Sequence, residues 1–458
     1  MNKVIVIGAG PAGLAAGYYL AKNNVKILVL EKENQPGGIC KTIEYKGCRF
    51  DIGGHRFFTD IAEIERLWYE ILGDKLLKRP RLSRIYYNNK FFDYPLSLTN
   101  TVKNLGLFGS FLILASYLKS QFIKEKEIVT FEDYITKYFG KRLFKIFFKV
   151  YTEKVWGIPC TQISADWARQ RIAGLSVVSA ITDALIFGQD GNIRTLVKQF
   201  HYPVLGPGMM YEEIAENVIE MGGEVKTGLD VISLIHNSKK ILCVVGKDKN
   251  GRQAEFKTEN LISSMPLSEL IQKLKPTPPQ AILESSRELK YRDLLVVNLI
   301  CSNEHVFPDN WVYVHSPEVA LCRIQNYKNW SPAMVSDKTK TPLGLEYFCL
   351  QEDKLWNMED EELIKMAQKE LKKTGFTVTT EDGFVQRVTH AYPVYSIGYK
   401  EPLKIITDYL AQFDNLQTIG RAGRFRYDNM DEAIISGVFA AGNIIRKQEP
   451  AIVLENKT

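Results

Sequence analysis

The sequence predicts an α/β protein in which a discontinuous Rossmann-type domain is joined to a helical insert and to an antiparallel-sheet substrate domain. Three observations lead to this prediction. The chain opens with a β-branched run that passes into a glycine-rich turn and an apolar helix, two later segments return to alternating strand and helix, and the stretch between them is rich in strands. At 458 residues the chain is too long for one ordinary core, which indicates two or three domains.

The first 42 residues carry the most specific pattern. Lys3–Ile7 reads as a strand, and Gly8-Ala9-Gly10-Pro11-Ala12-Gly13 follows it as a G-x-G-x-x-G turn at the start of a helix. Gly8 allows the tight turn, Gly10 lets the backbone approach a pyrophosphate, and Gly13 lets the helix pack on the strand. A second strand ends at Glu31, whose carboxylate is placed to accept hydrogen bonds from a ribose. Together these features predict a dinucleotide site.

The residues after Glu31 favour a flavin over a nicotinamide. Gln35-Pro36-Gly37-Gly38 and then Thr42 resemble the two-glycine extension of FAD proteins of the glutathione-reductase and amine-oxidase type, in which a second turn approaches the cofactor. FAD is therefore the expected cofactor, with Gly37, Gly38 and Thr42 among its binding residues.

The alternation of elements divides the chain into five segments. We expect residues 1–60, 200–275 and 396–458 to form the three parts of the FAD-binding domain, residues 61–199 a mainly helical insert, and residues 276–395 the antiparallel-sheet substrate domain. Val231, in the second part, is expected to lie against the adenine. Residues 85–92 read as a hairpin around an Asn-Asn turn inside the insert.

Composition limits the classes of partner. A net charge of +6 is too small and too dispersed for a nucleic-acid surface, although it suits a substrate with phosphates. Seven cysteines without a C-x-x-C pair indicate a reduced, cytoplasmic protein with neither disulfides nor a metal site. Because the first strand begins at Lys3, we expect no cleavable signal peptide. The most apolar run, Leu107–Leu118, is shorter than the ~20 residues of a membrane span, so we expect no transmembrane segment and a buried helix rather than peripheral membrane contact.

A histidine lies in a glycine-hinged loop, Gly53-Gly54-His55, just after the first cofactor-binding segment. Paired glycines allow a backbone to approach a flat ring closely, so His55 is a candidate for facing the flavin. A structural role for this histidine is equally compatible with the pattern.

Three further motifs occur in a fixed order along the chain. The first is Tyr151-Thr152-Glu153-Lys154-Val155-Trp156-Gly157-Ile158-Pro159, followed by Trp167 and Arg171; the second is Cys322-Arg323-Ile324-Gln325-Asn326-Tyr327; the third is Gly420-Arg421-Ala422-Gly423-Arg424-Phe425-Arg426-Tyr427-Asp428-Asn429-Met430-Asp431. In this order they resemble UDP-galactopyranose mutases, which lie within the amine oxidase and protoporphyrinogen oxidase-like FAD superfamily. The loop at His55 is similar to the mobile histidine loop of that family.

The resemblance implies roles for individual residues. Arg171, Arg323 and Tyr427 would contact the diphosphate of a nucleotide sugar, Trp156 and Tyr392 would line the sugar pocket, and Gly420, Arg421 and Asp431 would belong to the C-terminal flavin motif. His55, Arg171 and Arg323 are the candidate catalytic residues. Paired guanidiniums suit a diphosphate because each forks two N–H donors onto anionic oxygens.

Two departures from the family concern the sugar. Phe58 occupies the position of a second histidine in the bacterial mutases, and Asp431-Glu432-Ala433 stands where the eukaryotic ones have Asp-His-Ser. The sugar specificity is therefore open, more than the recognition of the diphosphate.

The implied activity is a ring isomerisation of the UDP-galactopyranose to UDP-galactofuranose type, in which reduced FAD acts as a covalent catalyst. The implied partners are a nucleotide-diphosphate sugar and an external reductant such as NAD(P)H, and a homo-oligomer is among the expected states. The expected setting is the biosynthesis of cell-surface polysaccharide or lipopolysaccharide. Two alternatives stay open: an FAD-dependent oxidoreductase of the amine oxidase or protoporphyrinogen oxidase type, and a flavoprotein that binds a sugar nucleotide without turnover.

Overall fold

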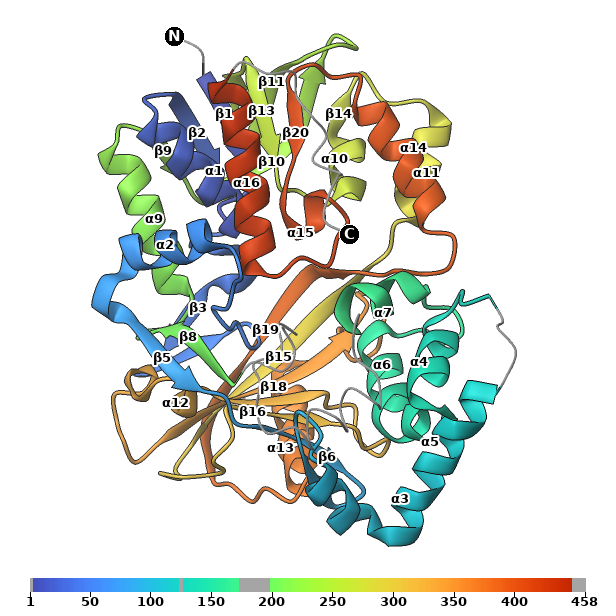
Figure 1. The fold of residues 1–458 in the computed structure, drawn as a ribbon. Helices are drawn as coiled ribbons and strands as arrows, with labels where there is room; N and C mark the ends of the chain where they lie inside the picture. The colour runs from blue at the N-terminus through green and yellow to red at the C-terminus, as the bar shows by residue number, and fades with distance from the viewer. Residues whose placement is uncertain (1–2, 123–126, 173–197, 447–458) are drawn as a thin grey trace.

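The computed structural model describes residues 3–122, 127–172 and 198–446. Residues 173–197 of the expected insert and residues 447–458 of the last expected segment lie outside the described residues. In Figure 1 a parallel sheet with its helices forms the upper half, and a large twisted sheet flanked by helices forms the lower half. The predicted α/β fold class is confirmed.

The upper half is built on a five-stranded sheet in which every neighbouring pair is parallel. Its order is β20 (Leu416–Thr418), β13 (Asn260–Ser263), β1 (Lys3–Ile7), β2 (Lys26–Leu30) and β9 (Glu224–Lys226). The adjacent strands β1, β13 and β20 thus come from the beginning, the middle and the end of the chain. Strand β1 alternates between two cores, since Val4 and Val6 pack into one apolar cluster and Ile5 and Ile7 into another.

Helices and a second sheet cover the two faces of the parallel sheet. One face packs against α1 (Pro11–Lys22), α9 (Gly208–Glu220) and α16 (Met430–Ile445). The other packs against α10 (Leu267–Lys273) and a sheet of order β12 (Gln253–Lys257), β11 (Ile241–Asp248), β10 (Leu229–His236) and β14 (Leu274–Lys275). Helices α11 (Gln280–Glu288) and α14 (Lys400–Leu410) pack together beside α10 (Figure 1).

The lower half is built on a seven-stranded sheet. Its order is β19 (Thr380–Pro393), β15 (Tyr291–Cys301), β18 (Thr341–Cys349), β17 (Arg323–Asn326), β16 (Trp311–Val314), β6 (Ser83–Tyr87) and β7 (Lys90–Asp93). All pairs are antiparallel except β16 with β6. The expected hairpin at residues 85–92 is confirmed: β6 and β7 flank Asn88 and Asn89, which have φ angles of 49° and 58°. It joins the large sheet rather than standing among helices.

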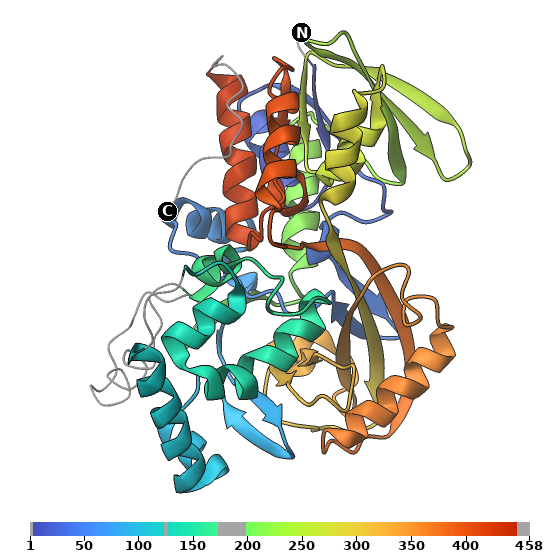
Figure 2. The same ribbon diagram turned by 90° about the vertical axis from the view of Figure 1, so that its right-hand side faces the viewer.

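Helices cover both faces of the large sheet, as Figure 2 shows. On one face Leu294 and Val296 pack with α4 (Phe131–Phe139), α6 (Val150–Trp156) and α7 (Ala165–Ile172). On the other, Leu295 and Val297 pack with α13 (Asp360–Lys373). The chain between α4 and α6 forms α5 (Lys141–Leu143) and a π-helical turn, Phe144–Lys149.

Shorter elements join the two halves. Helix α2 (Ala62–Leu72) packs against α9 of the upper half, although it belongs to the expected insert. The remaining described elements are two small antiparallel sheets, β3 (Thr42–Tyr45) with β4 (Cys48–Asp51) and β5 (Leu76–Pro80) with β8 (Gln199–Pro203), the helices α12 (Tyr327–Trp330) and α15 (Gly420–Gly423), and 3-10 turns at Gly38–Cys40, Gly73–Lys75 and Pro332–Met334. The five domain boundaries stay predictions.

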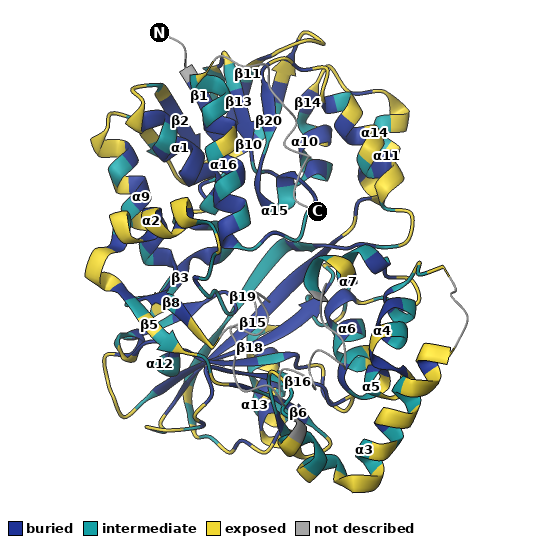
Figure 3. Cartoon of the chain, in the orientation of Figure 1, coloured by how far each residue is buried: buried dark blue, intermediate teal, exposed yellow. Residues whose placement is uncertain are grey.

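The apolar run Leu107–Leu118 is not buried, so that expectation is wrong. It belongs to α3 (Leu98–Phe122), a 25-residue helix kinked at Gly106, which packs along one side against α4, α5 and β7. Leu107, Phe108 and Phe111 are 81%, 75% and 64% exposed, and Figure 3 shows the helix largely yellow. Among the described residues one helix, Thr99–Phe122, is long and apolar enough to cross a membrane, which by itself is weak evidence for a span. The run Leu107–Leu118 covers only part of α3, because polar residues extend the helix at both ends.

Candidate functional site

Two cavities meet between the upper and lower halves of the molecule. The first reaches from the start of α1 to the arginines and aromatic residues of the lower half, and the second runs along the carboxyl end of β1 and β2 toward β10. They share five lining residues: Gly10, Gly38, Ile39, Ile52 and Ser264. The two cavities therefore form one elongated groove that crosses the N-terminus of α1.

Glycines allow a close approach of neighbouring segments where the groove crosses the N-terminus of α1. An added Cβ on Gly13 would come within 1.8 Å of the carbonyl oxygen of Gly8, and one on Gly8 within 2.1 Å of the Ser264 hydroxyl. Gly10 and Gly38 face each other, since a Cβ on Gly38 would lie 3.2 Å from the Gly10 Cα. Gly10 caps α1 without any side-chain hydrogen bond, which leaves the first amides of the helix open to a phosphate. This cradle fits the pyrophosphate of FAD.

The second cavity has the features of a nucleoside site. Glu31 lines it, and its two carboxylate oxygens accept hydrogen bonds from the amides of Ala9 (2.7 Å) and Glu33 (2.9 Å). These bonds hold the carboxylate in place while its remaining lone pairs face the cavity. Val231 lies 2% exposed on β10 and lines the same cavity. Both residues thus line the second cavity, and their contacts with the cofactor stay predictions.

Two predicted cofactor residues support the groove from outside its lining. The Thr42 hydroxyl donates to Asp51 (2.8 Å) and accepts from the Gly208 amide (3.0 Å), so it joins β3 to the start of α9. Gly37 adopts a φ of 111° and donates its amide to the carbonyl of Ala9 (2.8 Å), which brings the second glycine turn against the first. Their assignment as cofactor ligands stays a prediction.

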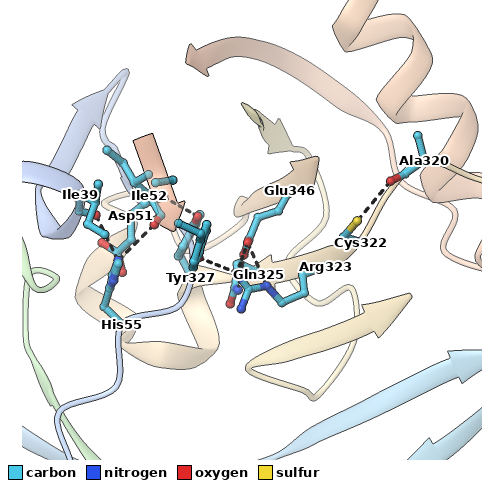
Figure 4. A network of polar contacts seen from close by, with 12 residues as sticks. Ile39, Asp51, Ile52, His55, Ala320, Cys322, Arg323, Gln325, Tyr327 and Glu346 are labelled. Carbon is cyan, nitrogen blue, oxygen red and sulfur yellow. Dashed lines mark hydrogen bonds and ion pairs between the residues drawn. The ribbon is translucent and has the colours of Figure 1, made fainter. Parts of the chain in front are cut away.

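His55 lines the first cavity in a fixed orientation. Its Nε2 lies 3.1 Å from the carbonyl oxygen of Ile39 and 3.2 Å from that of Ile52 (Figure 4). Burial, together with the positive charges of Arg421 and Arg323, lowers the pKa of His55 to about 3. The imidazole is therefore neutral, and Nε2 donates to these carbonyls.

Arg171 and Tyr427 meet at the mouth of this cavity, and both line it. The Arg171 guanidinium lies 4.7 Å from the centre of the Tyr427 ring and donates from Nη1 to the Asn429 side chain (3.2 Å). Arg171 comes from α7, whereas Tyr427 precedes α16. The structure thus brings together two residues that lie 256 positions apart in the sequence, as 427 − 171 shows.

Arg323 also lines the cavity, but a carboxylate already holds it. Its Nε donates to Glu346 (2.9 Å), its Nη2 bonds the same oxygen, and the other Glu346 oxygen accepts from Gln325 (2.7 Å), as Figure 4 shows. Glu346 is fully buried. Within the described residues the Nη1 of Arg323 makes no hydrogen bond, so this nitrogen alone is left for a ligand.

A stack of aromatic and cationic groups forms the floor of the cavity. The Arg421 guanidinium lies 5.0 Å from the ring centres of both Tyr392 and Tyr427, and its Nε donates to the carbonyl of Asp428 (2.8 Å). Trp156 is 2% exposed and packs edge-on against Tyr392 and Tyr427 from behind. Tyr392 therefore lines the cavity, whereas Trp156 supports the two tyrosines that do.

Two carboxylates lie at the start of α16. Asp428 is 1% exposed, and burial raises its pKa to about 6 despite the nearby guanidinium of Arg424 (3.4 Å). Asp431 is 1% exposed and lies in the first turn of α16, behind the cavity lining. Gly420, with a φ of 71°, lines the cavity at the start of α15, as the flavin motif implies.

The sequence analysis missed several lining residues. Arg56, Trp311 and Gln325 all face the first cavity. Arg56 follows His55 directly, so the histidine loop offered a signal for it, and Gln325 lies inside the second motif. Trp311 lies on β16 and carries no local pattern, because only the sheet topology brings it to the site.

Comparisons with known proteins agree with this geometry. Residues 6–71 match the NAD(P)-binding Rossmann-like domain family. A crystal structure of reduced UDP-galactopyranose mutase superposes with a TM-score of 0.81 over 98% of this chain and 96% of that one, at 20% identity. A protein of Exiguobacterium provisionally assigned as a protoporphyrinogen oxidase superposes with a TM-score of 0.73 over 98% of this chain and 99% of that one, at 18% identity.

Curated relatives match over shorter stretches. The dTDP-fucopyranose mutase of Escherichia coli is 27% identical over 184 residues, which is 36% of this chain and 45% of the relative. The 1-hydroxycarotenoid 3,4-desaturase of Flavobacterium sp. (strain P99-3) is 31% identical over 161 residues, which is 32% of this chain and 33% of the desaturase. The matched part thus spans less than half of either relative.

Fold and groove together define an FAD-binding protein with the architecture of flavin-dependent enzymes, and FAD is its cofactor. Within this class the resemblance to UDP-galactopyranose mutases, predicted from three short motifs, is confirmed for the fold over nearly the whole chain.

Proposed function

We propose that this protein is an FAD-dependent nucleotide-sugar mutase, which interconverts the pyranose and furanose rings of a UDP-galactose type of substrate. One observation carries the proposal: Arg171, Arg323 and Tyr427, from three distant segments, line one cavity that continues into the flavin groove. An apolar or amine substrate gives no reason to place guanidiniums there, whereas a diphosphate does.

The residues of this chain divide the chemistry among them. Arg171 and the free Nη1 of Arg323 bind the diphosphate and stabilise the negative charge that develops on it as the bond to the sugar breaks. Tyr427 holds Arg171 through its ring face. The neutral His55 orients the flavin edge through a fixed ring, because both carbonyls around Nε2 keep it in one tautomer. When bound and reduced, FAD supplies a nucleophilic centre to the sugar.

The printed names of two similar proteins support a nucleotide-sugar substrate. One acts on UDP-galactopyranose and the other on dTDP-fucopyranose, so the shared feature is a pyranose attached to a nucleoside diphosphate. The sugar is the point at which this chain departs from the family motifs, at Phe58 and at Glu432-Ala433.

The proposal is tested with the purified holoenzyme under anaerobic conditions. UDP-galactopyranose is added to dithionite-reduced and to oxidised protein, and the nucleotide sugars are separated by chromatography. A furanose product that forms with the reduced protein but not with the oxidised protein supports the mutase proposal. Binding without product keeps the diphosphate site and moves the search to other sugars, whereas absence of both binding and product overturns the proposal.

An FAD-dependent oxidoreductase is the second candidate. The carotenoid desaturase and the provisional protoporphyrinogen oxidase favour it, since both are redox enzymes by name and the latter superposes over nearly the whole chain. Reduction of the bound flavin by an added amine or porphyrinogen, in the absence of nucleotide-sugar binding, would favour this candidate.

The cellular setting belongs to the same proposal. A nucleotide-sugar mutase would serve the biosynthesis of cell-surface polysaccharide or lipopolysaccharide in the cytoplasm, and it would need an external reductant such as NAD(P)H. We also propose that the protein assembles as a homo-oligomer, which sedimentation of the holoenzyme would check.

A further inference from the structure

The first cavity holds one cationic side chain that the proposed diphosphate site does not use. Arg56 follows the histidine loop and turns away from His55, so its guanidinium lies 5.5 Å from the centre of the Trp311 ring. Both Arg56 and Trp311 line the cavity. Among the described residues no carboxylate and no hydrogen-bond acceptor pairs with Arg56.

Aromatic rings and further guanidiniums surround Arg56. Arg81 packs over the same Trp311 ring at 5.5 Å and over Tyr94 at 4.9 Å, so two guanidiniums share one aromatic side chain. Burial, with Arg81 and Arg171 nearby, lowers the pKa of Arg56 to about 10, which still leaves it protonated at neutral pH. A half-buried cation with cationic neighbours is costly unless an anion joins it.

The charges that line the cavity favour an additional anion. Four arginines line it, and Glu346 compensates Arg323. Arg56, Arg171 and Arg421 have no carboxylate partner within the described part of the chain, and the lining carboxylate Asp428 forms its ion pairs with Arg424 and Arg426 instead. A nucleoside diphosphate that binds at Arg171 and Arg323 leaves Arg56 without an anionic partner.

The position of Arg56 indicates where this anion lies on the substrate. Arg171 and Tyr427 belong to α7 and to the loop before α16, whereas Arg56 packs on β16 of the large sheet. A sugar held between the diphosphate and this sheet would turn its far substituents toward Arg56. Tyr313, beside Trp311 on the same strand, also lines the cavity and offers a hydroxyl there.

We propose that Arg56 binds a carboxylate on the sugar of the substrate, so that the natural substrate is a nucleoside diphosphate uronic acid. This inference rests on the proposed function and adds the class of sugar to it. The planar guanidinium of Arg56, placed over the Trp311 ring, matches a planar carboxylate, which can accept two parallel hydrogen bonds from it.

The test compares three ligands by calorimetry on the FAD-loaded protein: UDP, UDP-galactose and UDP-galacturonic acid. We expect wild-type protein to bind UDP-galacturonic acid at least about tenfold more tightly than UDP-galactose, because a charge-assisted hydrogen bond is gained. Arg56→Gln should abolish this preference, and Arg56→Lys, which keeps the charge but loses the fork, should retain part of it. Arg66→Gln removes an exposed arginine of α2 and serves as the matched control.

The outcomes separate this inference from the proposed function. Equal affinities of the wild-type protein for the two sugars overturn the inference, as does a preference that persists in Arg56→Gln. If Arg56→Gln weakens all three ligands equally, Arg56 belongs to the diphosphate site and the uronic acid is again excluded. Failure of the wild-type protein to bind even UDP overturns the proposed function itself. Flavin content and melting temperature of each variant show that a lost preference is not lost folding.

Discussion

The two walls of the groove are built in opposite ways. The cofactor wall consists of glycines that closely approach other backbone or short side chains (Gly8, Gly10, Gly38 and Gly420), whereas the substrate wall consists of long side chains (Arg56, Arg171, Arg323, Tyr392 and Tyr427). The cofactor wall depends on the absence of side-chain atoms at its glycines. The substrate wall depends on whether a carboxylate neutralises each arginine. The spacing of glycines in the sequence predicts where backbone can approach closely. It does not predict which carboxylate neutralises which arginine, because these partners come from distant strands.

The largest effect is expected where the cofactor wall gains an atom. In Gly13→Val the new Cβ would lie 1.8 Å from the Gly8 carbonyl oxygen, and neither backbone can move without breaking the turn. We expect protein without bound FAD, measured by flavin absorbance after denaturation.

Gly442→Ala is the matched control for Gly13→Val. Its Cβ would meet only the flexible end of Arg446, so this variant should keep FAD and gain up to about 1 kcal/mol from helix propensity. A Gly13→Val protein with full flavin content would contradict the steric account of the cofactor wall.

The next effect separates the structural and ligand roles of Arg323. Arg323→Ala leaves the fully buried Glu346 without its partner, so the free energy of unfolding should fall by roughly 3–5 kcal/mol, and nucleotide-sugar binding should be lost. The double variant Arg323→Met with Glu346→Leu removes both charges and should recover stability but not binding.

Urea denaturation and calorimetry with UDP-galactose measure these two quantities separately. Wild-type affinity in the stable double variant would exclude Arg323 from the diphosphate site and leave it a purely structural residue.

Arg171 should give a smaller effect that falls on binding alone, because no carboxylate among the described residues forms an ion pair with it. Arg171→Ala is expected to weaken UDP binding by about 1.5–3 kcal/mol, the range for a hydrogen bond to a charged group. Arg169→Ala, on the same helix, is the control: its side chain is 51% exposed and pairs with Asp166. Similar losses in both variants would mean that α7 acts through its general charge rather than through Arg171.

The smallest effect, counted per pH unit, concerns a carboxylate that joins the two halves. Asp51 accepts hydrogen bonds from Thr42 and Tyr202, and its carbonyl accepts one from Tyr327 (2.6 Å). Burial raises the pKa of Asp51 to about 7, whereas an aspartate in an unfolded chain titrates near ~3.9. Between these values the folded protein binds a proton that the unfolded chain has released, so stability should fall as pH rises from about 4 to about 7 and then level off.

Asp51→Asn removes this titrating group. The decrease of the free energy of unfolding with pH should therefore become less steep, by at most about 1.4 kcal/mol per pH unit. Denaturation curves between these pH values measure it, and Asp74→Asn, at an exposed site, should follow the wild type. An unchanged slope in Asp51→Asn would show that other groups carry the pH dependence.

Most of the cofactor wall could be predicted from the sequence. Gly8, Gly10 and Gly38 were found by spacing because a close backbone approach requires glycine, and Glu31 was found by its distance from them. The substrate wall was only partly predictable. Motif resemblance supplied Arg171 and Tyr427, whose presence in one cavity depends on tertiary packing.

The remaining features depend on contacts that no local pattern encodes. Glu346 compensates Arg323 only because β17 pairs with β18, so the spacing of either segment cannot reveal it. Trp156 supports the tyrosines from behind because α6 packs on the sheet face beneath them. The exposure of α3 was missed for a similar reason, since an apolar sequence does not say whether a partner surface exists.

The order of strands in the parallel sheet has a consequence for biosynthesis. Strand β1 is synthesised first, yet its neighbour β13 begins at residue 260, and β20 and the flavin motif follow only after residue 415. A nascent chain therefore carries an incomplete cofactor groove until β20 and the flavin motif that follows it have been synthesised. Contacts of such long sequence separation form slowly. We therefore expect a chain to retain flavin only once β20 and the flavin motif have been synthesised. A chain truncated before β20 should be colourless.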